Sequence, residues 1–276
     1  MSTTLQDRLA VCSWSLRPES PADLARDLNA IGIRRTQLAI DPVRLGGAWA
    51  DGFAKLRDLG IAVVNGMFAA VGEDYSTLDS IRDTGGIVPD GTWPQTFDNF
   101  RRMAPLVSKA GLTQITFHAG FLPHDTTDPN YAKLTTRLEK VADLFADHGL
   151  TCCLETGQED AESLRGFLDA LNRPNVGVNF DPANLILYDK GDPIAGLRTL
   201  LPHVASCHIK DARRTTTPGT WGEEVVVGTG EVDWRAFFST LSGGGFTGTL
   251  VIEREAGATR VEDIQTAHRF VQGLLG

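Results

Sequence analysis

Four polar side chains stand at the ends of apolar, strand-like segments in the second half of the chain. Glu155 follows CCL, Asp181 follows VNF, His208 follows ASC and Glu253 follows LVI. Asp181 lies 26 residues after Glu155, and His208 lies 27 residues after Asp181, about one strand–helix unit each. Burial and mutual repulsion would force protons onto three carboxylates that shared a site without a partner. The four residues therefore predict a divalent-metal site, with oxygen ligands and one imidazole favouring Mn²⁺, and Mg²⁺ or Co²⁺ as alternatives.

A metal held by such residues supports proton transfer beside a carbonyl. The cation would bind a substrate carbonyl and the neighbouring hydroxyl, acidify the C–H between them and stabilise an ene-diolate. A carboxylate would remove the proton, and return of a proton from the opposite face would invert the carbon. Return to the neighbouring carbon would give isomerisation, and loss of a β-hydroxyl would give dehydration. The pattern predicts this chemistry without selecting among the three outcomes.

The segments around these residues predict the elements that position them. Eight short apolar or β-branched runs alternate with longer amphipathic segments. The expected strands are 9–14, 36–40, 61–68, 113–120, 151–156, 176–181, 204–210 and 248–255, and the expected helices are 21–30, 47–59, 94–110, 130–148, 160–171, 192–201, 233–242 and 261–274. Such alternation implies parallel strands with right-handed crossovers, and eight units in 276 residues predict a single α/β domain over 1–276, a (β/α)₈ TIM barrel. A doubly wound sheet is the alternative, weakened because no GxGxxG follows the first strand.

Two expected connections, 69–93 and 211–232, are long and follow strand C-termini. In a barrel this is the catalytic face, so the connections are expected to be lids or substrate walls, with mobile excursions as the alternative.

Composition narrows the classes of partner. The net charge of −9 argues against nucleic acid, because Lys and Arg supply most non-specific affinity for phosphates. There is no basic, apolar leader and no run of about 20 apolar residues, so neither a signal peptide nor a membrane span is expected. The four cysteines lie in strand-like runs without a CxxC pair, which favours buried thiols and a cytoplasmic location over disulfides or a zinc site.

Five motifs make the sequence resemble the xylose isomerase-like TIM barrel superfamily, the sugar phosphate isomerase/epimerase family. They are LETG around Glu155, NFDPAN around Asp181, CHIKD around His208, IERE around Glu253 and VGTGEVDW at 227–234. The superfamily contains sugar isomerases, epimerases and inosose dehydratases, and the resemblance covers essentially the whole chain.

In the ketose 3-epimerase branch of that superfamily, the matching Glu, Asp, His and Glu bind the metal. The resemblance implies that Glu155 and Glu253 also form the acid–base pair and that Arg214, six residues after His208, binds substrate oxygens. Two substrate-contacting positions depart from that branch: Asn184 replaces a His, and Ala161 replaces an acidic residue.

Other candidates for substrate binding lie near the expected strand ends. His118 is expected to contact the substrate or its carbonyl, with a structural hydrogen bond as the equal alternative. Lys210 shares the inward parity of His208. Trp14 and Phe68 are expected to wall a sugar ring, with core packing as the equal alternative. Asp211 is expected to orient a ligand or to cap the following loop.

The sequence therefore predicts an isomerase or epimerase with a small sugar or keto-sugar substrate. A lyase acting on a keto-sugar or inosose is the alternative on the same scaffold. An abasic-site endonuclease is disfavoured, because it needs a multinuclear site richer in His and a DNA-binding surface. A non-catalytic binding subunit is disfavoured by the complete ligand set. A homo-oligomer remains open.

Overall fold

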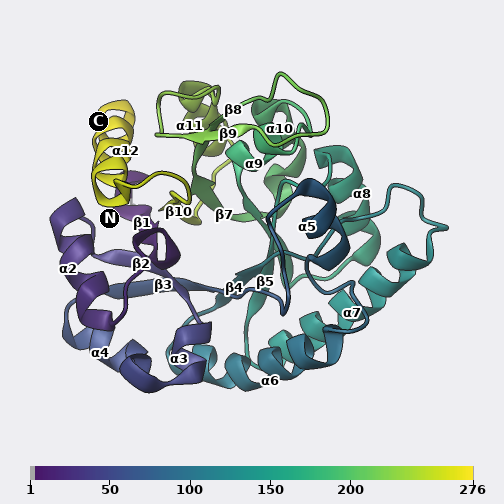
Figure 1. Cartoon of the computed structure of the whole chain (residues 1–276), viewed down its shortest axis with the longest axis horizontal. Helices are drawn as coiled ribbons and strands as arrows, with labels where there is room; N and C mark the ends of the chain where they lie inside the picture. Colours follow the sequence, from purple (N-terminus) through teal and green to yellow (C-terminus); the bar gives the residue numbers. More distant parts are fainter. Residues whose placement is uncertain (1–3, 276) are drawn as a thin grey trace.

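Eight parallel strands form a closed barrel in the computed structural model, which describes residues 4–275 (Figure 1). The strands are β1 (Leu9–Cys12), β2 (Arg35–Ala39), β3 (Ala62–Met67), β4 (Gln114–Phe117), β5 (Thr151–Glu155), β6 (Val176–Phe180), β7 (Val204–Ile209) and β10 (Thr249–Ile252). β10 pairs with both β7 and β1, which closes the ring. The predicted (β/α)₈ barrel is confirmed.

Helices cover the outside of the barrel. The eight expected ones correspond to α2 (Pro21–Ile31), α4 (Gly52–Asp58), α6 (Trp93–Lys109), α7 (Pro129–Ala146), α8 (Ala161–Leu171), α10 (Pro193–Leu200), α11 (Trp234–Gly243) and α12 (Arg260–Leu275). Short helices that the sequence did not predict are α1 (Ser13–Leu16), α3 (Asp41–Leu45), α5 (Leu78–Thr84) and α9 (Pro182–Leu187), and 3-10 turns span Gln6–Arg8, Gly47–Trp49 and Leu201–His203. α12 packs beside α2, so the last helix lies next to an early one (Figure 1).

Local signals account for the helix ends. Ser20 accepts a hydrogen bond from the amide of Asp23 in the first turn of α2, and Pro21 occupies the first helical position. Gly32 ends that helix with φ of 85°, a left-handed conformation that costs glycine little.

Aromatic side chains fill the layer between the barrel and its helices. Phe100 on α6 lies between the rings of Phe68 and Phe117, at centroid distances of 4.4 Å and 5.0 Å. Phe68 is fully buried there, so the expectation that it walls a sugar ring is wrong. Because β3 ends at Met67, which lines the central cavity, the alternation of side chains turns Phe68 outward to the helices.

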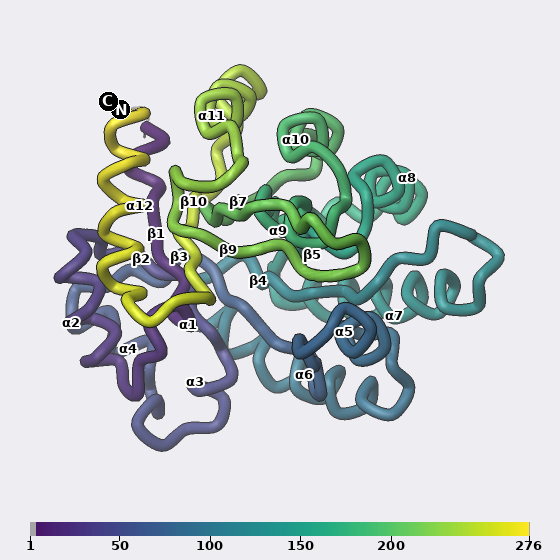
Figure 2. Tube along the Cα trace, turned by 45° about the horizontal axis from the view of Figure 1, so that its top comes forward, coloured from purple at the N-terminus to yellow at the C-terminus, as the bar shows by residue number. Residues whose placement is uncertain are grey.

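The two long connections lie at the same end of the barrel (Figure 2). The first contains α5. The second contains an antiparallel pair, β8 (Asp211–Arg213) and β9 (Glu223–Val225). Residues of both connections border the central cavity, as expected of substrate walls.

Asp211 fixes the second connection from inside. Its buried carboxylate accepts hydrogen bonds from the amides of Ala212, Gly228, Gly230 and Val232 and from the indole of Trp234, at 2.9–3.2 Å. A Cβ on Gly230 would lie 2.1 Å from Oδ1 of Asp211, so only glycine permits this approach. Capping of the loop is the role that the structure gives Asp211.

Within residues 4–275, no helix has the length and apolarity needed to cross a bilayer. The four cysteines are free and buried, as expected.

Candidate metal centre and active site

The four predicted ligands meet at the C-terminal ends of β5, β6, β7 and β10. One ligand atom from each of Glu155, Asp181, His208 and Glu253 lies within 4.8 Å of the others, and all four residues are buried. Nδ1 of His208 lies 3.3 Å from a carboxylate oxygen of Glu155, 3.3 Å from one of Glu253 and 3.5 Å from Oδ2 of Asp181. The barrel brings together residues that are nearly 100 positions apart.

Three buried atoms of this cluster make no hydrogen bond among the described residues and have only ion-pair contacts at 3.2–3.5 Å: Oε2 of Glu155, Oδ2 of Asp181 and Nδ1 of His208. The two carboxylate oxygens of Asp181 have different roles. Oδ1 caps α9 by accepting hydrogen bonds from the amides of Ala183 and Asn184, whereas Oδ2 faces His208 in the cluster. Buried polar atoms normally find partners, and a divalent cation would satisfy all three at once. The donor set fits a metal.

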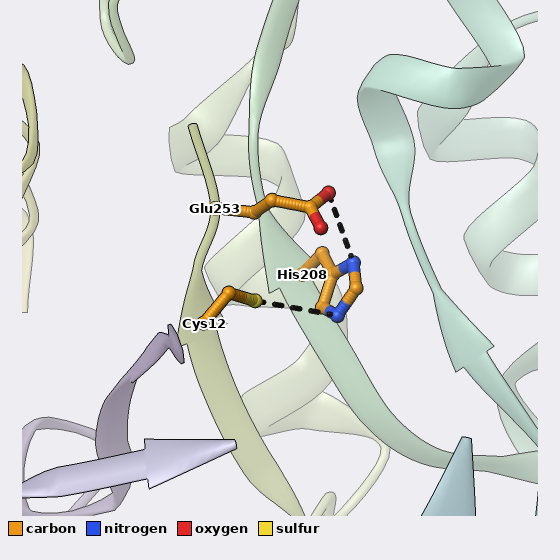
Figure 3. Close-up of side chains that lie close together, drawn as sticks. All are labelled: Cys12, His208 and Glu253. Atoms are coloured by element: carbon orange, nitrogen blue, oxygen red, sulfur yellow. Dashed lines mark hydrogen bonds and ion pairs between the residues drawn. The ribbon is translucent and has the colours of Figure 1, made fainter. Parts of the chain in front are cut away.

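The other ring nitrogen of His208 is held by Gln37. Nε2 of His208 lies 2.8 Å from Oε1 of Gln37, so in the neutral imidazole that a metal would require, the proton belongs on Nε2 and Nδ1 would be the coordinating atom. Sγ of Cys12 also lies near Nε2, at 3.8 Å, on the side of the ring opposite Glu253 (Figure 3). Burial raises the pKa of the Cys12 thiol far above its usual range, which keeps it protonated. Cys12, His208 and Glu253 form a second group of ligand-type atoms, but this one lacks Glu155 and Asp181.

Opposite charges balance inside the cluster. Burial disfavours the charged form of His208, but Glu253 and Glu155 outweigh it and raise the pKa of His208 well above its ordinary value. Burial likewise opposes ionisation of Glu253, yet His208 and Lys210 hold the pKa of that carboxyl well below its usual range. The same opposition lowers the pKa of Glu155, through His118 and His208. These contacts favour the ionised form of both glutamates.

Lys210 lies inside the site, as its parity predicted. Its ammonium group contacts Glu253 at 2.7 Å, Glu255 at 3.1 Å and Asp181 at 3.2 Å. Three carboxylates thus surround this buried cation.

A cavity of about 710 Å³ opens above the cluster, a size suited to a small-molecule ligand. Of the expected substrate-binding residues, Trp14, His118, Asn184 and Lys210 line it. Nε1 of Trp14 donates to Glu253 at 2.7 Å, and Nδ2 of Asn184 donates to Glu155 at 3.1 Å. Nε2 of His118 lies 3.5 Å from Oε2 of Glu155.

Arg214 is not among the described residues that line this cavity. Its guanidinium pairs with Asp189 at 2.7 Å and donates to the carbonyl of Gly191 at 3.2 Å, which directs it toward the loop after α9. The position of Arg214, six residues after His208, did not predict this direction. Arg214 lies just beyond the end of β8, where the alternation of a strand no longer fixes the direction of the side chain. The structure does not bring Arg214 into the site.

Sequence reasoning missed several residues that line the cavity: Glu73, Tyr75, Tyr188, Trp221 and Glu224. Four belong to the two long connections already expected to be substrate walls, and Tyr188 directly follows α9. Glu73 accepts hydrogen bonds from the amides of Gly86 and Ala70, at 3.0 Å and 3.2 Å. Burial raises the pKa of Glu73. The sequence signal that could have identified them is the presence of acidic and aromatic residues in connections already expected to border the substrate.

Fold and site define a (β/α)₈ barrel with three carboxylates and a histidine converging at the C-terminal ends of its strands. A profile of the family described as "Xylose isomerase-like TIM barrel" matches residues 48–274. The chain belongs to the xylose isomerase-like TIM barrel family.

Solved structures and a characterised relative extend the comparison. A xylose isomerase domain protein from Planctomyces limnophilus is 33% identical with a TM-score of 0.84, over 90% of this chain and 91% of that one. The 3-keto-D-glucoside 4-epimerase of Escherichia coli shares the fold, with 12% identity and a TM-score of 0.72 over 96% and 99% of the chains. An inosose dehydratase from Lactiplantibacillus plantarum is 25% identical over 165 residues, 53% of this chain and 55% of that protein. The chain matches 31% and 55% of the lengths of the two curated relatives first found.

Proposed function

We propose that this protein is a metal-dependent sugar isomerase or epimerase in which Glu155 and Glu253 form the acid–base pair. One observation carries the proposal: four ligand-type atoms from four neighbouring strands converge within 4.8 Å beneath a cavity of about 710 Å³. Sugar epimerases and a dehydratase among the similar proteins support a carbohydrate substrate.

Glu155, Asp181, His208 and Glu253 would hold the divalent cation, with Mn²⁺ proposed and Mg²⁺ or Co²⁺ as alternatives. When bound, such an ion polarises a substrate carbonyl and the hydroxyl beside it.

The two glutamates would approach a substrate from different sides of the barrel. Glu155 ends β5 and Glu253 follows β10, with β6 and β7 between them in the barrel. Asn184 orients Glu155, while Trp14 and Lys210 each hold one oxygen of Glu253. One glutamate, as a carboxylate, would remove and keep the proton beside the carbonyl, and the other, in its protonated form, would deliver a different proton to the opposite face for epimerisation; delivery of a proton to the neighbouring carbon would give isomerisation.

Aromatic rings supply walls for a sugar. Trp14, Tyr75, Tyr188 and Trp221 line the cavity, and the rings of Tyr188 and Trp221 meet edge to face at 4.6 Å. Rings of this kind pack against the apolar faces of a ligand while polar groups fix its orientation.

A dehydratase is the second candidate, and Glu73 is the observation that favours it. This carboxyl lines the cavity, and its raised pKa suits a group that carries a proton and gives it to a departing hydroxyl. The inosose dehydratase among the relatives supports the same reading.

Deuterium incorporation tests the proposal and separates the candidates. The purified protein in D₂O with Mn²⁺ is offered ketoses, keto-sugars and inososes and followed by NMR, with EDTA as the control. Metal-dependent deuterium beside the carbonyl, with an epimer or isomer as product, is the expected result. Deuterium with an unsaturated product would instead identify a dehydratase, and no exchange with any compound would contradict both.

A further inference from the structure

Glu224 on β9 reaches across the mouth of the barrel to the loop that follows β10. Its carboxylate accepts hydrogen bonds from the amide of Glu255 at 2.9 Å and from the amide of Ala256 at 3.1 Å. Nη1 of Arg254 donates to the same carboxylate at 2.9 Å. The side chain of Glu224 is only 9% exposed, so its carboxylate is a buried anion bound by the donors around it.

These donors stand where barrels commonly bind phosphate. The loops after the seventh and eighth strands form the phosphate site in many (β/α)₈ enzymes, with backbone amides as donors. Here β7 and β10 are the seventh and eighth barrel strands, Glu224 belongs to the connection after β7, and Glu255 and Ala256 follow β10. The chain thus fills the usual anion position with its own carboxylate.

The rest of the cavity offers little to a second anion. Carboxylates among its lining residues are Asp41, Glu73, Glu155, Glu224, Glu253 and Glu255. The lining cation among the described residues is Lys210, which already contacts Asp181, Glu253 and Glu255. An added phosphate would meet repulsion from these lining carboxylates, while Lys210 is already surrounded by three of the carboxylates in the site and Arg260, outside the lining, already interacts with Glu224 and Glu255.

We propose that the cavity accepts an uncharged sugar or keto-sugar and rejects its phosphate ester, and that Glu224 determines this specificity by occupying the anion position. The inference rests on the proposed sugar chemistry for its substrate, but the occupied anion position can be tested independently of turnover.

Binding of inorganic phosphate to the Mn²⁺-loaded protein tests the position directly. Removal of the carboxylate in Glu224→Ala frees two amides and releases Nη1 of Arg254 from that carboxylate, while Nε of Arg254 stays paired with Asp263, so phosphate should bind at least about tenfold more tightly than to the wild type. Glu224→Gln keeps the size of the side chain and should show a smaller gain, because its amide oxygen still accepts a hydrogen bond. Glu223→Ala changes an exposed neighbour on the same strand and should leave phosphate affinity unchanged. Phosphate bound by the metal contributes equally to all four proteins. Equal affinity in all four by calorimetry would overturn the proposal.

Paired substrates test the specificity. Each ketose in the deuterium experiment is offered with its phosphate ester, and exchange is expected on the free sugar but not on the ester. Faster exchange on a phosphate ester by the wild type would refute the inference while leaving the proton-transfer chemistry intact. If no compound exchanges, the proposed function fails, and the phosphate-binding comparison still decides whether Glu224 fills an anion site.

Discussion

At the scale of single residues, the site places ionisable side chains in buried surroundings that exclude water. Glu155 and Glu253 are almost fully buried, yet cationic and hydrogen-bonding neighbours keep their pKa values low. Removing one charge from such a set leaves its partners uncompensated. Glu→Gln substitutions also remove the charge, but they keep the size of the side chain and its hydrogen-bonding atoms, so they disturb the site less than truncations do.

The isosteric substitutions Glu155→Gln and Glu253→Gln should each lower the rate of epimer or isomer formation by about 10²- to 10⁴-fold, because an amide can neither take up nor deliver the proton. Product formation at saturating Mn²⁺, followed by NMR, measures the effect, and circular dichroism checks that the fold is retained. Wild-type turnover in either variant would remove that residue from the acid–base pair.

Gln37 should matter to the metal without touching it. Its Oε1 accepts from Nε2 of His208, and its Nε2 donates to Thr116 at 3.1 Å, so both ends of the amide are fixed. In Gln37→Ala the imidazole loses this orientation, and Mn²⁺ affinity measured by calorimetry should fall about 10- to 100-fold.

Cys12→Ala is the matched control for Gln37→Ala, because it removes the other neighbour of the same ring nitrogen. Affinity for Mn²⁺ should stay at the wild-type level in this variant. Weaker Mn²⁺ binding in Cys12→Ala, with unchanged binding in Gln37→Ala, would contradict the role given to Gln37 and would indicate that the thiol contributes to the metal site.

At the scale of elements, strand periodicity made the metal cluster predictable. Spacings of 26 and 27 residues between polar strand ends place those ends side by side in any barrel of regular units. The alternation of side chains also predicted an inward Lys210. The same reasoning predicted the direction of Phe68 wrongly. Side-chain direction depends on where β3 ends, and a difference of one residue moves a side chain from the cavity to the core.

The sequence predicted that the two long connections border the substrate cavity, but it did not predict which of their side chains line it. Glu73, Trp221 and Glu224 occupy segments without periodicity, where tertiary contacts fix side-chain directions. Arg214 shows the limit: a sequence offset assigned it to the substrate, whereas an ion pair with Asp189 turns it elsewhere. The proposed cytoplasmic location and homo-oligomer stay predictions.

Asp211 should control the order of the second connection. Asp211→Ala leaves several buried donors without an acceptor, and about 3 kcal/mol of stability should be lost. Hydrogen exchange over 212–232 should accelerate, and KM should rise because Trp221 and Glu224 line the cavity.

Asp233→Ala controls for damage to the neighbouring helix. Asp233 caps α11 through the amide of Ala236, so its loss should cost about 1 kcal/mol without loosening the connection. Equal exchange over 212–232 in both variants would argue against the role given to Asp211.

At the scale of the whole molecule, one buried acid outside the cluster ties stability to pH. Burial raises the pKa of Glu159 to about 8, with Lys190 opposing the shift and Asp160 adding to it. The folded protein therefore keeps a proton that the unfolded chain releases. This contribution is complete below the unfolded pKa of about 4.3 and is lost as the pH rises through about 8.

Glu159→Gln removes this dependence. The stability of the variant relative to the wild type should increase by about 1.4 kcal/mol for each pH unit between pH 5 and pH 8. Thermal melting across that range measures the difference, and Glu19→Gln, an exposed substitution, should show no trend. A constant difference between Glu159→Gln and wild type would contradict the raised pKa.

The closure of the ring by β10 also has a consequence for the order of events during synthesis. Of the eight barrel strands, β10 is translated last; it neighbours β1 and is directly followed by Glu253. Three of the four proposed ligands are therefore translated well before the fourth, and the set becomes complete only when the final strand joins the first. In a nascent chain, capture of the proposed metal at the complete site would therefore mark the moment at which the barrel has closed.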